Sequence, residues 1–245
     1  MERPRIVVTL ANPDRASDPH LAALKNVRYV EALERAGAVA VPLDDRVPPS
    51  QRTASWADMD GLLLSGGADV DPARYGEEPA GARAVEPERD ELEDQALRAA
   101  LGAGVPVLGV CRGLQAINVF SGGSLVQHLG GHESEAYPSP AVTRHRLDLA
   151  PGSRLATILG ASDELEVNSY HHQAIRPQDL APGLVASGVA PHEEGPLVEA
   201  LESADGGRWL VGVQCHPERP ELIGPEFARL WRAFVDAARG AAHRS

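Results

Sequence analysis

Short apolar runs alternate with helix-like segments through the first half of the chain, and this alternation is the feature that most constrains the fold. Helical periodicity or a Glu-, Ala- and Leu-rich composition marks 21–36 and 88–102, and a further helix contains 115–121. The runs between them are typical of buried strands and cover residues 6–11, 38–43, 60–64 and 105–110. Because strands that alternate with helices are joined by right-handed crossovers, this half predicts a mostly parallel sheet.

The pattern changes after residue 140. Short strand-like runs then follow one another without long helices between them, at 146–149, 165–167, 184–189, 197–201 and 209–214. The closing segment 225–238 places its large apolar residues on one helical face. We therefore expect a three-layer α/β/α fold whose mostly parallel central sheet carries an antiparallel extension. No repeat or long linker interrupts the chain, so a single domain over 1–245 is predicted.

The composition excludes several classes of protein. The chain has 245 residues, with 35 Asp and Glu against 23 Lys and Arg and a formal net charge of -12, which disfavours binding to nucleic-acid phosphates. Its two cysteines, Cys111 and Cys215, are too few for a disulfide framework. No apolar run reaches the roughly 18 residues that span a bilayer, and no signal-peptide pattern precedes the first strand. We expect a cytoplasmic protein that binds neither nucleic acid nor membranes.

Cys111 lies in the most informative stretch of the sequence. It is the centre of a Gly-x-Cys-x-Gly pattern, residues 109–113, between a buried run and a helix. This is the pattern of a nucleophile elbow, with sulfur in place of the serine oxygen. Glycines on either side avoid clashes at the sharp turn, and the helix N-terminus favours the thiolate. An isolated free cysteine is more often a buried structural residue, but the glycines and the strand–turn–helix context favour a nucleophile.

His216 and Glu218 supply the partners that such a nucleophile needs. A thiol requires a base, and the base requires an orienting group. Two residues apart on an extended strand, the side chains would project to the same side. Glu218 could then accept a hydrogen bond from one imidazole nitrogen while the other nitrogen faces Cys111. The alternative is an ordinary surface His-Pro-Glu turn. The order Cys, His, Glu is compatible with a triad, because triads are defined by roles and not by sequence order.

With these motifs in this order, the chain resembles class I glutamine amidotransferases. Within them it is most similar to peptidase family C26, especially the bacterial γ-glutamyl-γ-aminobutyrate hydrolases. The resemblance is spread over five segments, which are 64–77, 109–125, 167–173, 198–200 and 213–218. One position departs from the family pattern, since an aromatic residue usually precedes the histidine and here Cys215 does. We expect Cys215 to pack in the core behind the site.

The resemblance implies a cysteine-dependent hydrolase that cleaves γ-glutamyl amide bonds through a γ-glutamyl thioester and needs no cofactor. It implies that Cys111 is the nucleophile, His216 the base and then the acid, and Glu218 the orienting carboxylate. The implied oxyanion hole consists of the backbone N–H groups of Gly67 and Arg112. The implied contacts to the glutamyl part of the small-molecule substrate are Gln115, Ser169 and Tyr170.

Two other functions remain open at this stage. One is a glutaminase subunit that supplies ammonia to a separate synthase. The other is a non-catalytic binding or regulatory protein that retains a vestigial site. The sequence names neither the leaving amine nor the oligomeric state, so a homodimer is also left open.

Several histidines raise the question of a metal ion. His171 and His172 are adjacent, so on a strand they would face opposite sides, and no carboxylate-rich ligand set accompanies them. His128 and His132 flank a Gly-Gly pair and are predicted to lie in a loop. We therefore expect no metal site.

Overall fold

The computed structural model describes residues 2–134, 141–161 and 164–242. Both ends of the predicted domain, residues 1 and 245, lie outside this part. The strands are β1 (Arg5–Thr9), β2 (Val39–Leu43), β3 (Gly61–Leu64), β4 (Val107–Val110), β5 (Thr143–Leu149), β6 (Glu164–Ser169), β7 (Leu184–Ala190), β8 (Leu197–Ser203) and β9 (Leu210–Val213). The α-helices are α1 (Pro19–Arg35), α2 (Pro49–Ala57), α3 (Pro87–Ala103), α4 (Arg112–Phe120), α5 (Arg154–Leu159) and α6 (Ala228–Ala242).

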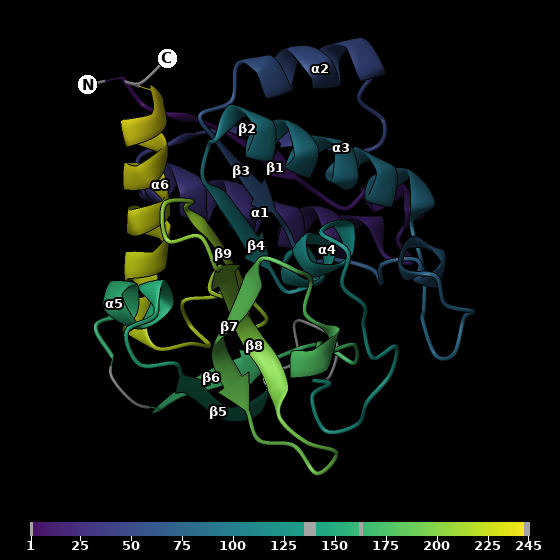
Figure 1. Cartoon of the computed structure of the whole chain (residues 1–245). Coiled ribbons are helices and arrows are strands. Elements are labelled where there is room, and N and C mark those ends of the chain that lie inside the picture. The colour runs from purple at the N-terminus through teal and green to yellow at the C-terminus, as the bar shows by residue number, and fades with distance from the viewer. Residues whose placement is uncertain (1, 135–140, 162–163, 243–245) are drawn as a thin grey trace.

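The described strands form one sheet in the order β2-β1-β3-β4-β9-β8-β7-β5-β6. The pairs from β2 to β9 are parallel. The pairs from β9 through β8, β7 and β5 to β6 are antiparallel. The antiparallel strands extend from the parallel part toward the lower half of the view in Figure 1. The predicted mostly parallel sheet with an antiparallel extension is confirmed.

Helices cover both faces of the parallel part and create two cores. One core joins the sheet to α1, α5 and α6, and the other joins it to α3 and α4 (Figure 1). Successive residues of a strand enter opposite cores, as Leu62 and Leu63 of β3 do. Burial on both faces explains why these strands read as continuous apolar runs in the sequence.

The position of β9 differs from the sequence prediction. The run 209–214 was expected among the antiparallel strands, but β9 is parallel to β4 on one side and antiparallel to β8 on the other. An apolar run carries no information about the direction of its neighbour, and β9 pairs with a strand about a hundred residues earlier in the chain. This pairing matters because it places the carboxyl ends of β3, β4 and β9 side by side.

Two helices were not predicted. α2 begins at Pro49 without a side-chain cap, and its described residues include no fully buried side chain. α5 spans only Arg154–Leu159, although Ser153 caps its first turn by accepting a hydrogen bond from Ala156 N. A helix this short, or one without a buried stripe, gives little periodic signal in a sequence.

The junction between β4 and α4 is a tight turn at Cys111. The residue has φ 52 and ψ -108, and among the described non-glycine residues only Ala84 shares a positive φ. A Cβ atom at Gly109 would lie 2.6 Å from the carbonyl oxygen of Gly113. A Cβ atom at Gly113 would overlap the backbone of Leu64 in β3. The two glycines are therefore needed for close approach of backbone segments, as the elbow pattern predicts.

We expect Gly113→Ala to destabilise the protein by about 1–3 kcal/mol or more, because the new methyl group would push α4 away from β3. The matched control is Gly102→Ala, which is exposed in α3 with no atom within 4 Å of an added Cβ. It should change stability by less than about 1 kcal/mol. Urea unfolding followed by circular dichroism measures both variants. Equal stabilities would contradict the steric explanation.

Candidate active site

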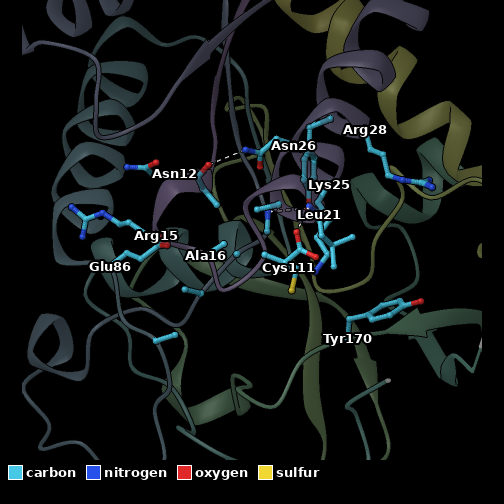
Figure 2. A pocket seen from close by; sticks show the side chains of 18 of the residues that line it. Asn12, Arg15, Ala16, Leu21, Lys25, Asn26, Arg28, Glu86, Cys111 and Tyr170 are labelled. Atoms are coloured by element: carbon cyan, nitrogen blue, oxygen red, sulfur yellow. Dashed lines mark hydrogen bonds between the residues drawn. The ribbon is translucent and has the colours of Figure 1, made fainter. Parts of the chain in front are cut away.

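A cavity of about 920 Å³ opens at the carboxyl ends of the parallel strands and reaches Cys111. Its described lining comes from the loop after β1, from α1, from 66–68 and 84–86, and from segments near Tyr170 and His216. Figure 2 shows Cys111 between Arg15 and Glu86 on one side and Tyr170 on the other. This is where ligands bind in open α/β sheets, outside the carboxyl ends of the strands.

Cys111 is held at the cavity by hydrogen bonds to the end of β9 and to the residue that follows it. Its backbone N–H donates to Val213 O at the end of β9, at 2.8 Å. The side-chain amide of Gln214 donates to the Cys111 sulfur at 3.4 Å. Arg112 is the first residue of α4, so its backbone N–H has no acceptor within the helix. The sulfur thus lies beside a helix N-terminus, an environment that favours a thiolate.

His216 and Glu218 lie in a turn beyond the end of β9 and not on an extended strand. The expected strand geometry was therefore wrong, but the expected contact is present. His216 Nδ1 and Glu218 Oε1 are 2.7 Å apart, and both side chains are buried. The carboxylate accepts from Nδ1–H, which leaves Nε2 as the ring nitrogen that can interact with Cys111.

Each member of the His216–Glu218 pair favours the charged form of the other. Burial lowers the pKa of His216, but the negative charges of Glu218 and of the Cys111 thiolate outweigh burial and raise it to about 9. Burial raises the pKa of Glu218, but His216 outweighs this effect and holds it below its usual value. At neutral pH the site therefore favours a His216 imidazolium paired with the Glu218 carboxylate. A protonated imidazole beside a thiolate is the resting form of an activated cysteine.

Asn168 fixes the backbone of the histidine turn. Its side-chain oxygen accepts from His216 N at 2.8 Å, and its side-chain amide donates to His216 O at 3.1 Å. From α6, Trp231 Nε1 donates to Pro217 O at 3.2 Å. No role was predicted for Asn168, Gln214 or Trp231. The one signal for Asn168 was its position in 167–173, a segment that carries the family resemblance.

The Gly66–Gly67 loop follows β3 and lies against Cys111. Gly66 N donates to the hydroxyl of Tyr29 at 3.1 Å. A Cβ at Gly66 would lie 2.6 Å from that hydroxyl and 3.2 Å from His216 Cε1. The loop can therefore pass this close only without a side chain. This places the backbone of Gly67 at the cavity, whose lining includes both glycines.

Arg89 of α3 supports this loop from behind. It is buried and donates to the carbonyl oxygens of Ser65 and Gly66, at 3.2 and 3.0 Å. Its Nε donates to Glu93 at 3.0 Å. A Cβ at Gly67 would collide with its guanidinium group. A charged side chain that donates to backbone carbonyls fixes a loop more firmly than neutral contacts do.

Glu93 connects the loop to the helix that carries the cysteine turn. It forms ion pairs with both Arg89 and Arg112, and Arg112 also pairs with Asp90. Thr9 donates to Glu93 at 2.8 Å. Burial raises the pKa of Glu93, but the two arginines outweigh burial and hold it below its usual value. The network of Arg89, Asp90, Glu93 and Arg112 links the parts of the site that follow β3 and β4.

The three residues predicted to contact the glutamyl group occupy different positions. Tyr170 lines the cavity, and its ring lies edge-on to His216 with centroids 5.4 Å apart. Gln115 is buried and donates to Gln173 O at 3.0 Å and to the side chain of Gln214 at 3.1 Å. Ser169 is buried and donates to His132 O at 2.6 Å. The cavity lining does not include Gln115 or Ser169, so their substrate contacts stay predictions.

Cys215 lies in the core shared by α1, α5 and α6. Burial, with the charges of Glu199 and Glu218, raises the pKa of its thiol well above the usual value. A neutral buried thiol is unreactive. Nearby Glu199 is also buried, and burial raises its pKa to about 8.

The sheet has the class I glutamine amidotransferase-like fold. The Peptidase C26 family model matches residues 9–218, so the chain belongs to the peptidase C26 family. The match covers the Gly66–Gly67 loop, Cys111, His216 and Glu218. The chain is thus a glutamine amidotransferase-class hydrolase that acts on amide bonds.

Relatives and solved structures agree with this family. Rv2859c of Mycobacterium tuberculosis, whose name assigns it provisionally to the glutamine amidotransferases, is 41% identical over 221 residues, covering 88% of this chain and 68% of that protein. The gamma-glutamyl-gamma-aminobutyrate hydrolase of Escherichia coli O157:H7 is 31% identical over 213 residues, covering 81% and 80%. The glutaminase domain of Trypanosoma brucei CTPS has a TM-score of 0.65 at 18% identity, covering 97% and 94%.

Among the described residues, no helix has the length and apolar character needed to cross a membrane.

The ion pair at His216 predicts how stability depends on pH. Because the folded-state pKa of about 9 lies above the ordinary 6.5, the pair stabilises the protein fully below about pH 6.5, and this contribution is lost as the pH rises toward 9. Glu218→Gln should lower the pKa of His216 and flatten this dependence. NMR titration of labelled histidine and urea unfolding between these pH values measure both effects. An unchanged pKa in the variant would contradict the assignment.

Proposed function

We propose that the protein is a cysteine-dependent hydrolase of γ-glutamyl amide bonds, with Cys111, His216 and Glu218 as its catalytic triad. The carrying observation is that the ends of β4 and β9 bring the cysteine turn and the buried His216–Glu218 pair together at one cavity. The 31% identity to a gamma-glutamyl-gamma-aminobutyrate hydrolase supports the γ-glutamyl substrate class.

Acylation begins from the thiolate of Cys111. Its sulfur attacks the γ-carbonyl carbon, and the negative charge moves to the carbonyl oxygen, which receives hydrogen bonds from the backbone N–H groups of Gly67 and Arg112. The imidazolium of His216 gives its proton to the leaving nitrogen as the C–N bond breaks, and the amine departs. Each backbone donor of such a site contributes on the order of 10²–10³ in turnover.

Deacylation uses the same histidine in the opposite sense. Neutral His216 takes a proton from water, and the hydroxide attacks the thioester carbon. The C–S bond then breaks to release glutamate and restore the thiolate. Glu218 orients the ring throughout and stabilises its charged form, and Asn168 holds the backbone of the turn in place.

We expect Cys111→Ala to abolish the release of glutamate from γ-glutamyl amides, by on the order of 10³-fold or more, since no other group can form the thioester. Cys215→Ala is the matched control, because it removes the other cysteine, which is buried in the core. It should retain activity. A screen of γ-glutamyl amides by mass spectrometry of both products measures the effect and identifies the leaving amine.

Two outcomes of this screen would contradict the proposal. Glutamine hydrolysis that appears only when a synthase is added would show a glutaminase subunit. No hydrolysis of any amide, together with failure of a glutamine-like diazoketone to label Cys111, would show a non-catalytic protein.

We further propose that the leaving amine carries a carboxylate that binds near Lys25. Lys25 and Arg219 both line the cavity. Burial lowers the pKa of Lys25, and the nearby positive charge of Arg219 lowers it further. Arg219 also pairs with Glu218 at 3.4 Å, and Lys25 adds a second positive charge to the cavity, which an anionic group of the substrate would stabilise.

Lys25→Met should raise KM about 10- to 100-fold for γ-glutamyl amides of an amine that carries a carboxylate, as expected for loss of a charged hydrogen bond. Amides of an uncharged amine should be unaffected. Arg35→Met is the control, because it removes an exposed charge from the same helix outside the cavity. Equal increases in KM for both kinds of amide would instead assign Lys25 to the glutamyl α-carboxylate.

A further inference from the structure

Three histidines and one glutamate converge behind the wall of the cavity. His132 lies in the loop after α4, His145 in β5, His171 in the loop after β6, and Glu199 in β8. One nitrogen from each ring and one carboxylate oxygen all lie within 4.8 Å of one another. No metal site was predicted from the sequence, because adjacent histidines face opposite sides of a strand and no carboxylate-rich ligand set accompanies them. The fold instead supplies these groups from four separate segments.

Glu199 is the least satisfied polar group in this cluster. Its side chain is 1% exposed, and neither carboxylate oxygen has a hydrogen-bond partner among the described residues. The nearest imidazole nitrogens of His171 and His145 are both 3.6 Å away, and that of His132 is 3.8 Å away. These distances are too long for hydrogen bonds. A buried carboxylate without hydrogen bonds is costly unless it takes up a proton or a cation lies against it.

Two of the histidines present a lone pair to the glutamate. His171 Nδ1 lies 2.9 Å from Gln173 O, and His145 Nδ1 lies 3.1 Å from Arg146 O. A carbonyl oxygen can only accept, so each Nδ1 carries the proton and each neutral ring has its lone pair at Nε2. These are the nitrogens that face Glu199. A backbone carbonyl that orients a ring in this way is the usual outer partner of a metal-binding histidine.

We propose that His132, His145, His171 and Glu199 bind one divalent transition-metal ion of the zinc class. The donors would be His132 Nδ1, His145 Nε2, His171 Nε2 and one oxygen of Glu199. In a tetrahedral zinc site with bonds of about 2.0–2.1 Å, the donor atoms are about 3.3 Å apart. The distance from His132 Nδ1 to His171 Nε2 is 3.3 Å. Glu199 Oε1 lies 3.8 and 3.6 Å from these two atoms, and His145 Nε2 lies 3.6 Å from the other oxygen, Oε2. A small inward movement of the side chains would complete the site.

A hydrogen-bonded cluster explains these contacts less well. His132 could donate to His171 at 3.3 Å, but this bond leaves both oxygens of Glu199 without a partner. Imidazole nitrogens with one carboxylate are a donor set that suits zinc. With four protein donors the ion has no open position, so we assign it a structural role. It would join four segments, one of which continues directly from Tyr170 in the cavity wall.

The proposal is independent of the catalytic function and can be tested without an activity assay. The protein is purified without a polyhistidine tag, and its metal content is measured by mass spectrometry. The metal-free protein is then titrated with Co²⁺, whose visible absorption reports tetrahedral geometry. We expect about one zinc per chain and one equivalent of tetrahedral Co²⁺. Zinc at 100 times its Kd should raise Tm by about 5–10 °C.

Variants locate the ion. Glu199→Gln and His171→Gln should each lose the bound metal and the zinc-dependent rise in Tm. His172→Gln is the matched control, since the neighbouring ring contacts Asp69 and not the cluster, and it should bind like the wild type. Cys111→Ala should also keep its metal, which excludes zinc held by the cysteine and His216.

The proposal is overturned if the wild type binds no stoichiometric metal, or if Glu199→Gln and His171→Gln bind as the wild type does. It is also overturned if Cys111→Ala alone abolishes binding. Should either cluster variant fail to fold, the wild-type Co²⁺ spectrum still decides. A thiolate-to-cobalt charge-transfer band, or octahedral geometry, would contradict the proposed nitrogen and oxygen donors.

Discussion

The close contact between the cysteine turn and β3 is the constraint on which the rest of the site depends. Because Gly113 packs directly on the backbone of Leu64, α4 starts immediately beside the strand that leads into the Gly66–Gly67 loop. The hydrogen bond from Cys111 N to Val213 O then ties the same turn to the end of β9. The ends of β3, β4 and β9 are thereby held at fixed positions relative to one another. Each contributes one part of the site, so its geometry follows from sheet pairing and does not rely on mobile loops.

Buried charge keeps these parts in place. Arg89 and Arg112 approach the site from α3 and α4, and Glu93 pairs with both, while Glu86 pairs with Arg89 and Asp90 with Arg112. Such a network contributes little to net stability, because taking charges out of water is costly, but it permits few alternative arrangements. Removing Glu93 alone would take away the carboxylate that the two buried arginines share. The network therefore acts mainly by specifying where the loop and the helix lie.

The sequence predicts this structure best where local chemistry determines it. The buried strands of the parallel sheet and the cysteine turn could be predicted, because apolar runs and the glycines of 109–113 are local signals. The direction of β9 could not, because it depends on pairing between residues about a hundred positions apart. The roles of Asn168 and Gln214 were missed for the same reason. Their amides act on backbone or sulfur atoms of other segments, and a single sequence does not report such contacts.

The hydrogen bond from Trp231 to Pro217 affects how heat inactivates the protein. Trp231 belongs to the core that α6 shares with the sheet, and it also holds the turn that carries His216. Loosening of α6 would thus weaken the support of the turn, which the two bonds from Asn168 would still hold, while the strands remain paired. Heat should then inactivate the protein at a lower temperature than it melts the sheet, and recovery on cooling would require only that one helix dock again.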